Sequence, residues 1–309
     1  MANPSRILIS GASGLIGTSL IRAFDARRIS VTRLIRDRQP QGPQEISWSP
    51  QSSSLVADAA QLDAFDAVIH LSGANLAAHR WTPAYKREIV ESRVQTTQAL
   101  AKLLAALDHP PPVFLCASAT GIYGDRGDEI LTESSAPGTG FLAETCMQWE
   151  DAAQPARAAG IRVVLMRFGV ALTPAGGGGA LSKLLPLFRL GLGGRLSSGE
   201  QWLSWISISD VVSAVFHLMQ DARLAGPVNM VSPIPVTNAE FTRVLGKVLH
   251  RPAIFPAPAF ALRAVVGEMA EEALLSSTRV IPARLAESGF HFEHARLDAA
   301  LESLLAKPA

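Results

Sequence analysis

The sequence predicts an α/β protein with a Rossmann-like, doubly wound parallel sheet and a smaller α/β lobe toward the C-terminus. Two patterns indicate this fold: short apolar runs typical of buried strands alternate with segments of helical periodicity, and a glycine-rich stretch follows the first run. The chain of 309 residues is 48% apolar and 18% charged. This length and composition support a substantial core in one large or two modest domains.

The first predicted strand, residues 7–9, ends at a turn with the spacing G-x-x-G-x-x-G, and a helix is predicted over 15–24. Backbone N–H groups and the positive end of the helix dipole converge at such a turn and favour a diphosphate group. A second strand about twenty residues on completes the βαβ unit of a dinucleotide-binding site. The residues predicted to bind the cofactor here are Gly11, Ser13, Gly14, Leu15, Ile16 and Gly17.

The second predicted strand, 28–35, is accompanied by Arg33, Arg36 and Arg38 where an NAD-preferring site usually has an acidic residue for the ribose 2′-hydroxyl. We expect Arg36 to contact a 2′-phosphate, which predicts NADP(H) over NAD. The alternative is that these arginines are solvated loop charges.

Strands are also predicted over 46–48 and 65–71, the second ending in small residues. A small-residue turn at the carboxyl end of a parallel strand is where ligands bind in open α/β sheets. The residues predicted to form the wall of the adenosine pocket are Leu71, Ser72, Gly73 and Ala74. On the next loop, before a helix predicted from Thr82 and Pro83 to about 107, Arg80 is either an anion clamp for the substrate or a loop-packing residue.

After a strand over 113–117, the motif Ser-Ala-Thr-Gly-Ile-Tyr-Gly-Asp makes a resemblance specific. The chain resembles the extended short-chain dehydrogenases/reductases, and within them an NAD-dependent epimerase/dehydratase-like subfamily with an added C-terminal segment of unknown function, sometimes labelled cell-division inhibitor-like. The matching stretches cover nearly the whole chain: 11–17, 80–82, 92–93, 118–125, 141–150, 167–170, 205–210 and 229–233.

The resemblance implies cofactor contacts beyond the glycine turn. The residues implied are Arg93, Arg167, Phe168, Gly169 and Val170. The last four belong to a stretch that lies against the nicotinamide and its ribose in the family. The resemblance implies an NAD(P) cofactor, and the preference for NADP(H) rests on Arg36.

The family's catalytic Tyr-x-x-x-Lys pair is absent, because the only tyrosines, Tyr85 and Tyr123, are followed four residues later by Ile89 and Gly127. In the family, the spacing of four residues places the tyrosine and lysine side chains together on a helix, where the lysine lowers the pKa of the tyrosine. Alignment with the family places Phe141 at the tyrosine position.

The same alignment places Thr145 at the lysine position and Ala119 at the Ser/Thr position, with hydroxyls on either side of Ala119. The usual mechanism therefore does not carry over.

Four other residues are candidates for the missing chemistry: Glu144, Ser118, Tyr123 and Arg80. Glu144 could serve as an acid or base from a partly apolar pocket, or be a helix-surface glutamate. Tyr123 could reach the pocket, or pack its ring and bond its hydroxyl locally. Glu150 is predicted to be a surface charge.

The second half is predicted to add three strands and five helices. The strands are 161–166, 202–208 and 227–231, and the helices are 181–190, 211–219, 237–249 and 259–275, followed by a last helix over 295–305. The predicted dinucleotide-binding domain comprises 1–170 and 203–232, and the smaller lobe comprises 171–202 and 233–309.

Composition excludes several classes of function. The net charge of +1 argues against a nucleic-acid partner. The sequence also lacks the uninterrupted apolar run of about 18 or more residues that a membrane span needs. Two cysteines make neither a disulfide framework nor a zinc cluster, so we expect no metal and a reducing cytoplasm. We expect a monomer or homodimer acting on an unidentified small polar or sugar-like substrate. The alternative is a catalytically silent NADP(H)-binding sensor or interaction protein.

Overall fold

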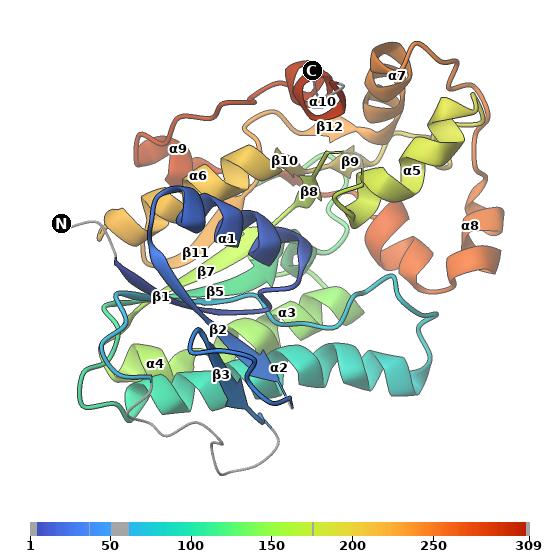
Figure 1. Ribbon diagram of the computed structural model, residues 1–309. Coiled ribbons are helices and arrows are strands. Elements are labelled where there is room, and N and C mark those ends of the chain that lie inside the picture. The colour runs from blue at the N-terminus through green and yellow to red at the C-terminus, as the bar shows by residue number, and fades with distance from the viewer. Residues whose placement is uncertain (1–4, 37, 51–61, 175, 307–309) are drawn as a thin grey trace.

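The computed structural model describes residues 5–36, 38–50, 62–174 and 176–306. A seven-stranded sheet with the strand order β11-β7-β5-β4-β1-β2-β3 forms its centre (Figure 1). All neighbouring strands in it run parallel. The strands are β1 Arg6–Ser10, β2 Ser30–Arg36, β3 Glu45–Trp48, β4 Ala67–His70, β5 Val113–Ala119, β7 Arg162–Phe168 and β11 Gly226–Met230. The predicted Rossmann-like doubly wound sheet is thus confirmed.

Helices cover both faces of the sheet, as Figure 1 shows. One face carries α1 Leu15–Ala26 and α6 Ile208–Gln220. The other carries α2 Pro83–Ala105, α3 Phe141–Asp151 and α4 Gln154–Ala158. A short 3₁₀ turn, η2 Thr120–Tyr123, joins β5 to the segment before α3.

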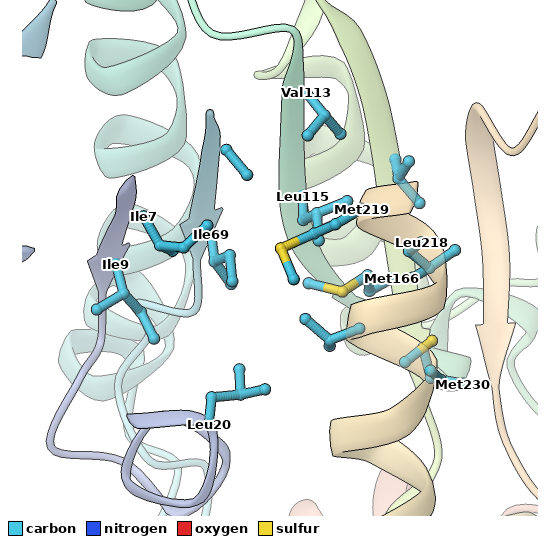
Figure 2. Packing of buried hydrophobic residues seen from close by; sticks show 14 of the residues in the cluster. Ile7, Ile9, Leu20, Ile69, Val113, Leu115, Met166, Leu218, Met219 and Met230 are labelled. Atoms are coloured by element: carbon cyan, nitrogen blue, oxygen red, sulfur yellow. The ribbon is translucent and has the colours of Figure 1, made fainter. Parts of the chain in front are cut away.

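The alternation of strand side chains divides the core into two layers. Ile7 and Ile9 of β1 join the layer under α1 and α6, whereas Leu8 joins the layer under α2, α3 and α4. Figure 2 shows the first layer, where Ile69 and Leu115 of neighbouring strands face Leu218 and Met219 of α6. Because a strand repeats every two residues, fully apolar runs bury both faces of a parallel sheet.

The smaller lobe packs three helices around its own apolar cluster. These are α5 Gly179–Arg189, α7 Asn238–Val248 and α10 Leu297–Leu305. Two short two-stranded sheets join the lobe to the central sheet: β8 Val170–Leu172 with β10 Trp205–Ser207, and β9 Trp202–Leu203 with β12 Val236–Thr237.

Two predicted elements of the second half are wrong in detail. The strand predicted over 202–208 is interrupted at Ser204, whose hydroxyl donates to the carbonyl of Thr278 at 2.6 Å, so that β9 and β10 enter different sheets. The helix predicted over 259–275 breaks at Gly267, where φ is +67° and a left-handed residue ends α8 Ala259–Val266. A π-helical turn, η3 Ala270–Leu275, follows.

The C-terminal segment returns to the sheet after η3. Strand β13 Arg279–Val280 pairs with β6 Ile130–Leu131, and α9 Ala283–Glu287 packs against β11. The proposed domain boundaries therefore remain predictions, although the apolar cluster of the lobe is separate from the two layers of the sheet. Among the residues described, no helix is long and apolar enough to cross a membrane.

His70, at the end of β4, is a fully buried polar side chain inside the sheet. Its Nδ1 lies 2.6 Å from the hydroxyl oxygen of Ser10, and its Nε2 lies 3.4 Å from that of Thr96. Burial lowers the pKa of His70 from 6.5 to about 3. The imidazole is therefore neutral in the folded protein at physiological pH.

This neutral histidine should make stability depend on pH. Below pH 6.5 the unfolded chain binds a proton at His70 that the folded protein excludes until about pH 3. The contribution of His70 to the free energy of unfolding should therefore fall by about 1.4 kcal/mol per pH unit within this window. Urea unfolding of the parent and of His70→Gln at pH 7, 6 and 5 should show their difference shrinking as the pH falls. A difference that stays constant with pH would contradict this assignment.

Candidate functional site

The glycine turn after β1 leaves the N-terminus of α1 open to an anion. Gly11 has φ +69°, and a Cβ there would lie 2.6 Å from the carbonyl carbon of Leu71. A Cβ on Gly17 would lie 2.4 Å from the Gly11 oxygen, so the helix could not approach the strand. Gly14 is the N-cap of α1, with no side-chain cap and no acidic residue in the first turn. The first N–H groups of the helix therefore remain available for a ligand.

Arg36 is the last residue of β2 and is exposed at the carboxyl edge of the sheet. Of the other two predicted arginines, Arg33 is exposed within β2, and Arg38 forms an ion pair with Glu45 at 3.1 Å. Arg36 is thus placed next to the glycine turn by the pairing of β2 with β1.

The loop after β4 is held against the glycine turn by α2. The N–H of Ala74 donates to the hydroxyl of Ser92 at 2.9 Å, and Nη2 of Arg93 donates to the Ala74 carbonyl at 3.0 Å. The N–H of Leu71 donates to the carbonyl of Ser10 at 3.2 Å. Ser72 and Gly73 lie between these fixed points, so the predicted wall has a defined backbone.

A buried ion pair joins the ends of β5 and β7 to α3. Nε and Nη2 of Arg167 each donate to Glu150 at 2.8 Å, and the Ser118 hydroxyl donates to Glu150 Oε1 at 2.7 Å. Although burial opposes the charged form, hydrogen bonds and the charge of Glu150 raise the pKa of Arg167. The prediction that Glu150 is a surface charge is wrong, because its carboxylate side chain is only 10% exposed. An acidic residue near the C-terminal end of α3 gave no sequence signal for this partner.

Tyr123 extends this network away from the sheet edge. Its ring is fully buried, its hydroxyl donates to Oδ1 of Asn229 at 2.7 Å, and Nη1 of Arg167 donates to the same hydroxyl at 2.9 Å. Burial raises the pKa of Tyr123, although Arg167 partly opposes the shift. This arrangement favours the second expectation for Tyr123, a packed ring with a locally bonded hydroxyl, over proton exchange with a substrate.

Glu133 lies at the far end of the network and was missed by sequence reasoning. Its Oε1 accepts from the N–H groups of Asn229 at 3.0 Å and Arg284 at 3.3 Å, whereas its Oε2 is buried without a partner in the part of the chain that the structure describes. Burial raises the pKa of Glu133. The network thus reaches from Ser118 at the strand end to the C-terminal segment.

The start of α3 is where the family carries its catalytic pair. In this protein it contacts the carboxylate of Glu272 from the C-terminal segment. The N–H groups of Phe141 and Leu142 donate to Glu272 of η3 at 3.3 and 3.1 Å. The hydroxyl of Thr145 is buried and donates to the Phe141 carbonyl at 2.7 Å. Glu144 is exposed on the same turn.

Two basic residues of the α2 region also contact the C-terminal segment. Nη1 of Arg80 donates to the carbonyl of Ala264 in α8 at 3.0 Å. Nζ of Lys86 forms an ion pair with Glu268 at 2.7 Å and lies 4.3 Å from the centre of the Phe141 ring. Arg80 is therefore both exposed and tied to the lobe, at the rim of the site.

The four catalytic candidates are not brought together. Ser118 and Tyr123 share one buried network, whereas Glu144 and Arg80 lie outside it and are exposed. The predicted cofactor residues 167–170 also differ in burial. Arg167 is buried in the network, whereas Phe168, Gly169 and Val170 are partly exposed at the edge of the sheet.

Metal-binding residues do not cluster within the described part of the chain, where no three His, Cys, Asp or Glu side chains gather in a suitable geometry. Both cysteines are buried, and burial raises the pKa of Cys116 and of Cys146 to about 12. Neither thiol is therefore poised for nucleophilic chemistry.

A parallel sheet with a glycine turn at its carboxyl edge defines a dinucleotide-binding class of α/β protein. Residues 7–230 match the NAD dependent epimerase/dehydratase family, and residues 257–304 match a domain of unknown function (DUF1731). The chain belongs to the NAD dependent epimerase/dehydratase family. The resemblance inferred from the sequence is thereby confirmed.

Relatives span the full length of the chain. An epimerase family protein of Mycobacterium bovis is 42% identical over 308 residues, covering 100% of both chains. One of Staphylococcus aureus is 35% identical over 303 residues, covering 97% of this chain and 99% of the relative.

Two solved structures are similar in fold and sequence. The crystal structure of the human epimerase family protein SDR39U1 with NADPH has a TM-score of 0.88 and 33% identity, covering 97% of this chain and 98% of that one. The nucleoside-diphosphate sugar epimerase from Corynebacterium glutamicum has a TM-score of 0.77 and 35% identity, covering 98% of this chain and 58% of that one.

Removing the carboxylate charge from the buried pair should strongly destabilise the fold. Glu150→Gln leaves the guanidinium of Arg167 buried without its counter-charge, which should lower the free energy of unfolding by about 3–5 kcal/mol. Urea denaturation of both proteins measures this change.

The matched control is Asp298→Asn, which breaks the exposed pair between Arg296 and Asp298. Water screens that pair, so the control should have a much smaller effect. If both substitutions lower the free energy of unfolding equally, the Arg167–Glu150 pair contributes no more to stability than an exposed pair does.

Proposed function

We propose that this protein binds NADP(H) at the carboxyl edge of its sheet and acts as an epimerase- or oxidoreductase-type enzyme on a small polar or sugar-like substrate. The observation that carries the proposal is the uncapped N-terminus of α1 behind the tight Gly11 turn, which fits a diphosphate. The NADPH present in the similar human structure supports the choice of cofactor.

The residues that would hold the dinucleotide follow the strand order. The diphosphate would bind the backbone of the glycine turn after β1, and the adenosine half would lie toward β2, with Arg36 at its 2′-phosphate. The loop after β4 and the ends of β5 and β7 would flank the nicotinamide half. When bound, the cofactor would supply or accept a hydride.

The chain's own residues would act on the substrate from the rim of the site. Glu144, exposed on the first turn of α3, would hold or release a proton, and Arg80 would orient an anionic or polar group. Ser118 and Tyr123 would position the strand ends through Glu150 and Arg167 and would not exchange protons with the substrate.

A second candidate is an NADP(H)-binding protein without turnover, which senses redox state or acts through a partner. The observation that favours it is the start of α3, where Phe141 and a buried Thr145 hold the positions of the family's tyrosine and lysine. Cofactor binding is common to both candidates, so turnover separates them.

Reversing the charge at Arg36 should change cofactor preference. Arg36→Asp removes the proposed partner of the 2′-phosphate and places a carboxylate there, so NADPH affinity should fall about 100-fold. NADH affinity should change little, because NADH lacks that phosphate. Titration calorimetry with both cofactors measures the ratio. Equal affinity of the parent protein for NADPH and NADH would refute the assignment.

Removing the acid at Glu144 should slow turnover without weakening the cofactor. Glu144→Gln should lower the rate of nicotinamide absorbance change about 100-fold in a panel of sugar-like substrates while NADPH affinity is retained. Gln148→Ala, an exposed site one turn further along α3, is the matched control and should leave the rate unchanged. If no substrate in a broad panel is turned over while NADPH raises the melting temperature, the sensor proposal is favoured.

A further inference from the structure

Large apolar side chains gather on the surface of the smaller lobe. The described part of the chain exposes nine of them, and seven come from α5, the loop after it and the segment from Ile254 through α8. Four lie on two adjoining loops and are between 54% and 73% exposed: Leu190, Leu192, Ile254 and Phe255. Figure 1 shows these loops at one edge of the molecule, where the chain between α7 and α8 passes the end of α5. Apolar side chains that gather in this way mark an interaction surface.

Backbone contacts hold the two loops side by side. The N–H of Phe255 donates to the Gly193 carbonyl at 3.1 Å, and the N–H of Ala257 donates to the Arg195 carbonyl at 2.9 Å. A Cβ on Gly194 would lie 2.0 Å from the carbonyl oxygen of Phe255, so only glycine lets the loops approach this closely. The fold therefore displays these apolar side chains in water from a fixed pair of backbone segments.

Cations surround the apolar side chains. A groove of about 460 Å³ lies between α7 and the second loop, and Ile254 lines it. The cationic side chains that also line it are Arg195, Arg243, Lys247 and Arg251. Among the described residues, no Asp or Glu lines this groove, although Arg243 pairs with Glu240 at 2.7 Å beside it. These cations and the four apolar side chains together form the lobe patch.

The backbone of the lobe patch is suited to an apolar medium. The N–H groups of Leu190 and Leu192 donate to carbonyls of α5, and that of Phe255 is bonded to the neighbouring loop. Residues 252, 256 and 258 are prolines, which have no N–H. Because an unpaired N–H is costly in hydrocarbon, side chains that enter a bilayer need a backbone whose N–H groups are bonded internally. This backbone also offers few donors to a protein partner.

A second copy of the chain fits the lobe patch poorly. A two-fold dimer would place the patch against itself. Arg195, Lys247 and Arg251 of both copies would then meet around a groove that no carboxylate lines in the described structure. An anionic partner avoids this repulsion, and one that also has an apolar layer would cover the exposed leucine, isoleucine and phenylalanine side chains.

We propose that the lobe patch docks this protein on the surface of an anionic lipid bilayer. The four apolar side chains enter the boundary between headgroups and acyl chains, and the cations contact the lipid phosphates. A surface contact of this kind needs no membrane-spanning run. The proposal is independent of the proposed NADP(H) binding, because none of the residues of the patch is assigned to the dinucleotide.

Flotation of the full chain with lipid vesicles tests this proposal. The protein should bind vesicles of phosphatidylcholine with about 30% phosphatidylglycerol, and it should bind phosphatidylcholine alone at least about 10-fold more weakly. Raising the salt from about 0.1 M to about 1 M should weaken the binding, because the Debye length falls from about 10 Å to about 3 Å.

Two double variants separate the contributions of charge and apolar surface. Arg195→Gln with Lys247→Gln should lower the affinity for anionic vesicles about 10- to 30-fold, because each cation near the bilayer contributes about fivefold. Leu190→Ser with Ile254→Ser should lower this affinity about 10- to 100-fold, and the loss should persist at high salt.

The matched controls change exposed side chains outside the lobe patch. Arg22→Gln with Lys102→Gln removes two cations from α1 and α2, and Ile130→Ser removes an apolar side chain that is 53% exposed on β6. Both controls should leave vesicle binding unchanged. Circular dichroism checks that each variant folds, and if the apolar double variant does not fold, the charge variant decides.

A parent protein that binds neither kind of vesicle would overturn the proposal, as would equal losses in the patch variants and the controls. Two other occupants have their own signatures. Without vesicle binding, a dimer in sedimentation equilibrium that Leu190→Ser with Ile254→Ser dissociates would assign the patch to a second copy. Binding of inorganic phosphate that Arg195→Gln with Lys247→Gln abolishes, again without vesicle binding, would assign the groove to a small anion. Either result would overturn docking on a bilayer and leave the proposed NADP(H) binding intact.

Discussion

The carboxyl edge of the sheet depends on the buried ion pair between Arg167 and Glu150. The two residues come from β7 and α3, and Ser118 adds the end of β5 through the same carboxylate oxygen. Three elements that form one side of the candidate site are therefore fixed by a single polar centre. Because a buried charge is costly unless it is paired and hydrogen-bonded, this ion pair favours the observed arrangement of the strand ends. Its extension through Tyr123 and Asn229 carries the same constraint to β11 and the C-terminal segment.

The C-terminal segment contacts the candidate site at the start of α3 and in the α2 region. Glu272 accepts from the first N–H groups of α3, Arg80 donates to α8, and Lys86 pairs with Glu268 beside the ring of Phe141. The helix turn that carries the family's catalytic tyrosine is thus covered by residues from the opposite end of the chain. At the positions of the family's tyrosine and lysine, this chain has Phe141 and Thr145. The ring of Phe141 packs against Trp81, and the hydroxyl of Thr145 donates to a carbonyl of its own helix.

Arg167 and Arg93 are two arginines of the site whose guanidinium groups have different partners. Arg167 is neutralised by Glu150 and bonds Tyr123, so it has become part of the scaffold. Arg93 instead donates to two backbone carbonyls and lies beside the ring of Trp149, so the hydrogen bonds of its guanidinium go to neutral groups. The residue type does not distinguish them, because a guanidinium can stabilise either a protein carboxylate or a bound oxygen anion. What separates them is which elements the fold brings within reach.

The sequence by itself determined the central sheet, the glycine turn and the family, because strand and helix periodicity and the glycine spacing are local features of the chain. It also showed that the Tyr-x-x-x-Lys pair is absent, which needs only residue identity and spacing. Sequence did not reveal the partner of Arg167, the burial of Glu150 and Glu133, the cap that Glu272 provides for α3, or the breaks at Ser204 and Gly267. These features depend on contacts between segments as far as 151 residues apart. Only the tertiary structure decides which polar groups meet inside the protein, because the cost of burying a charge depends on its neighbours in space.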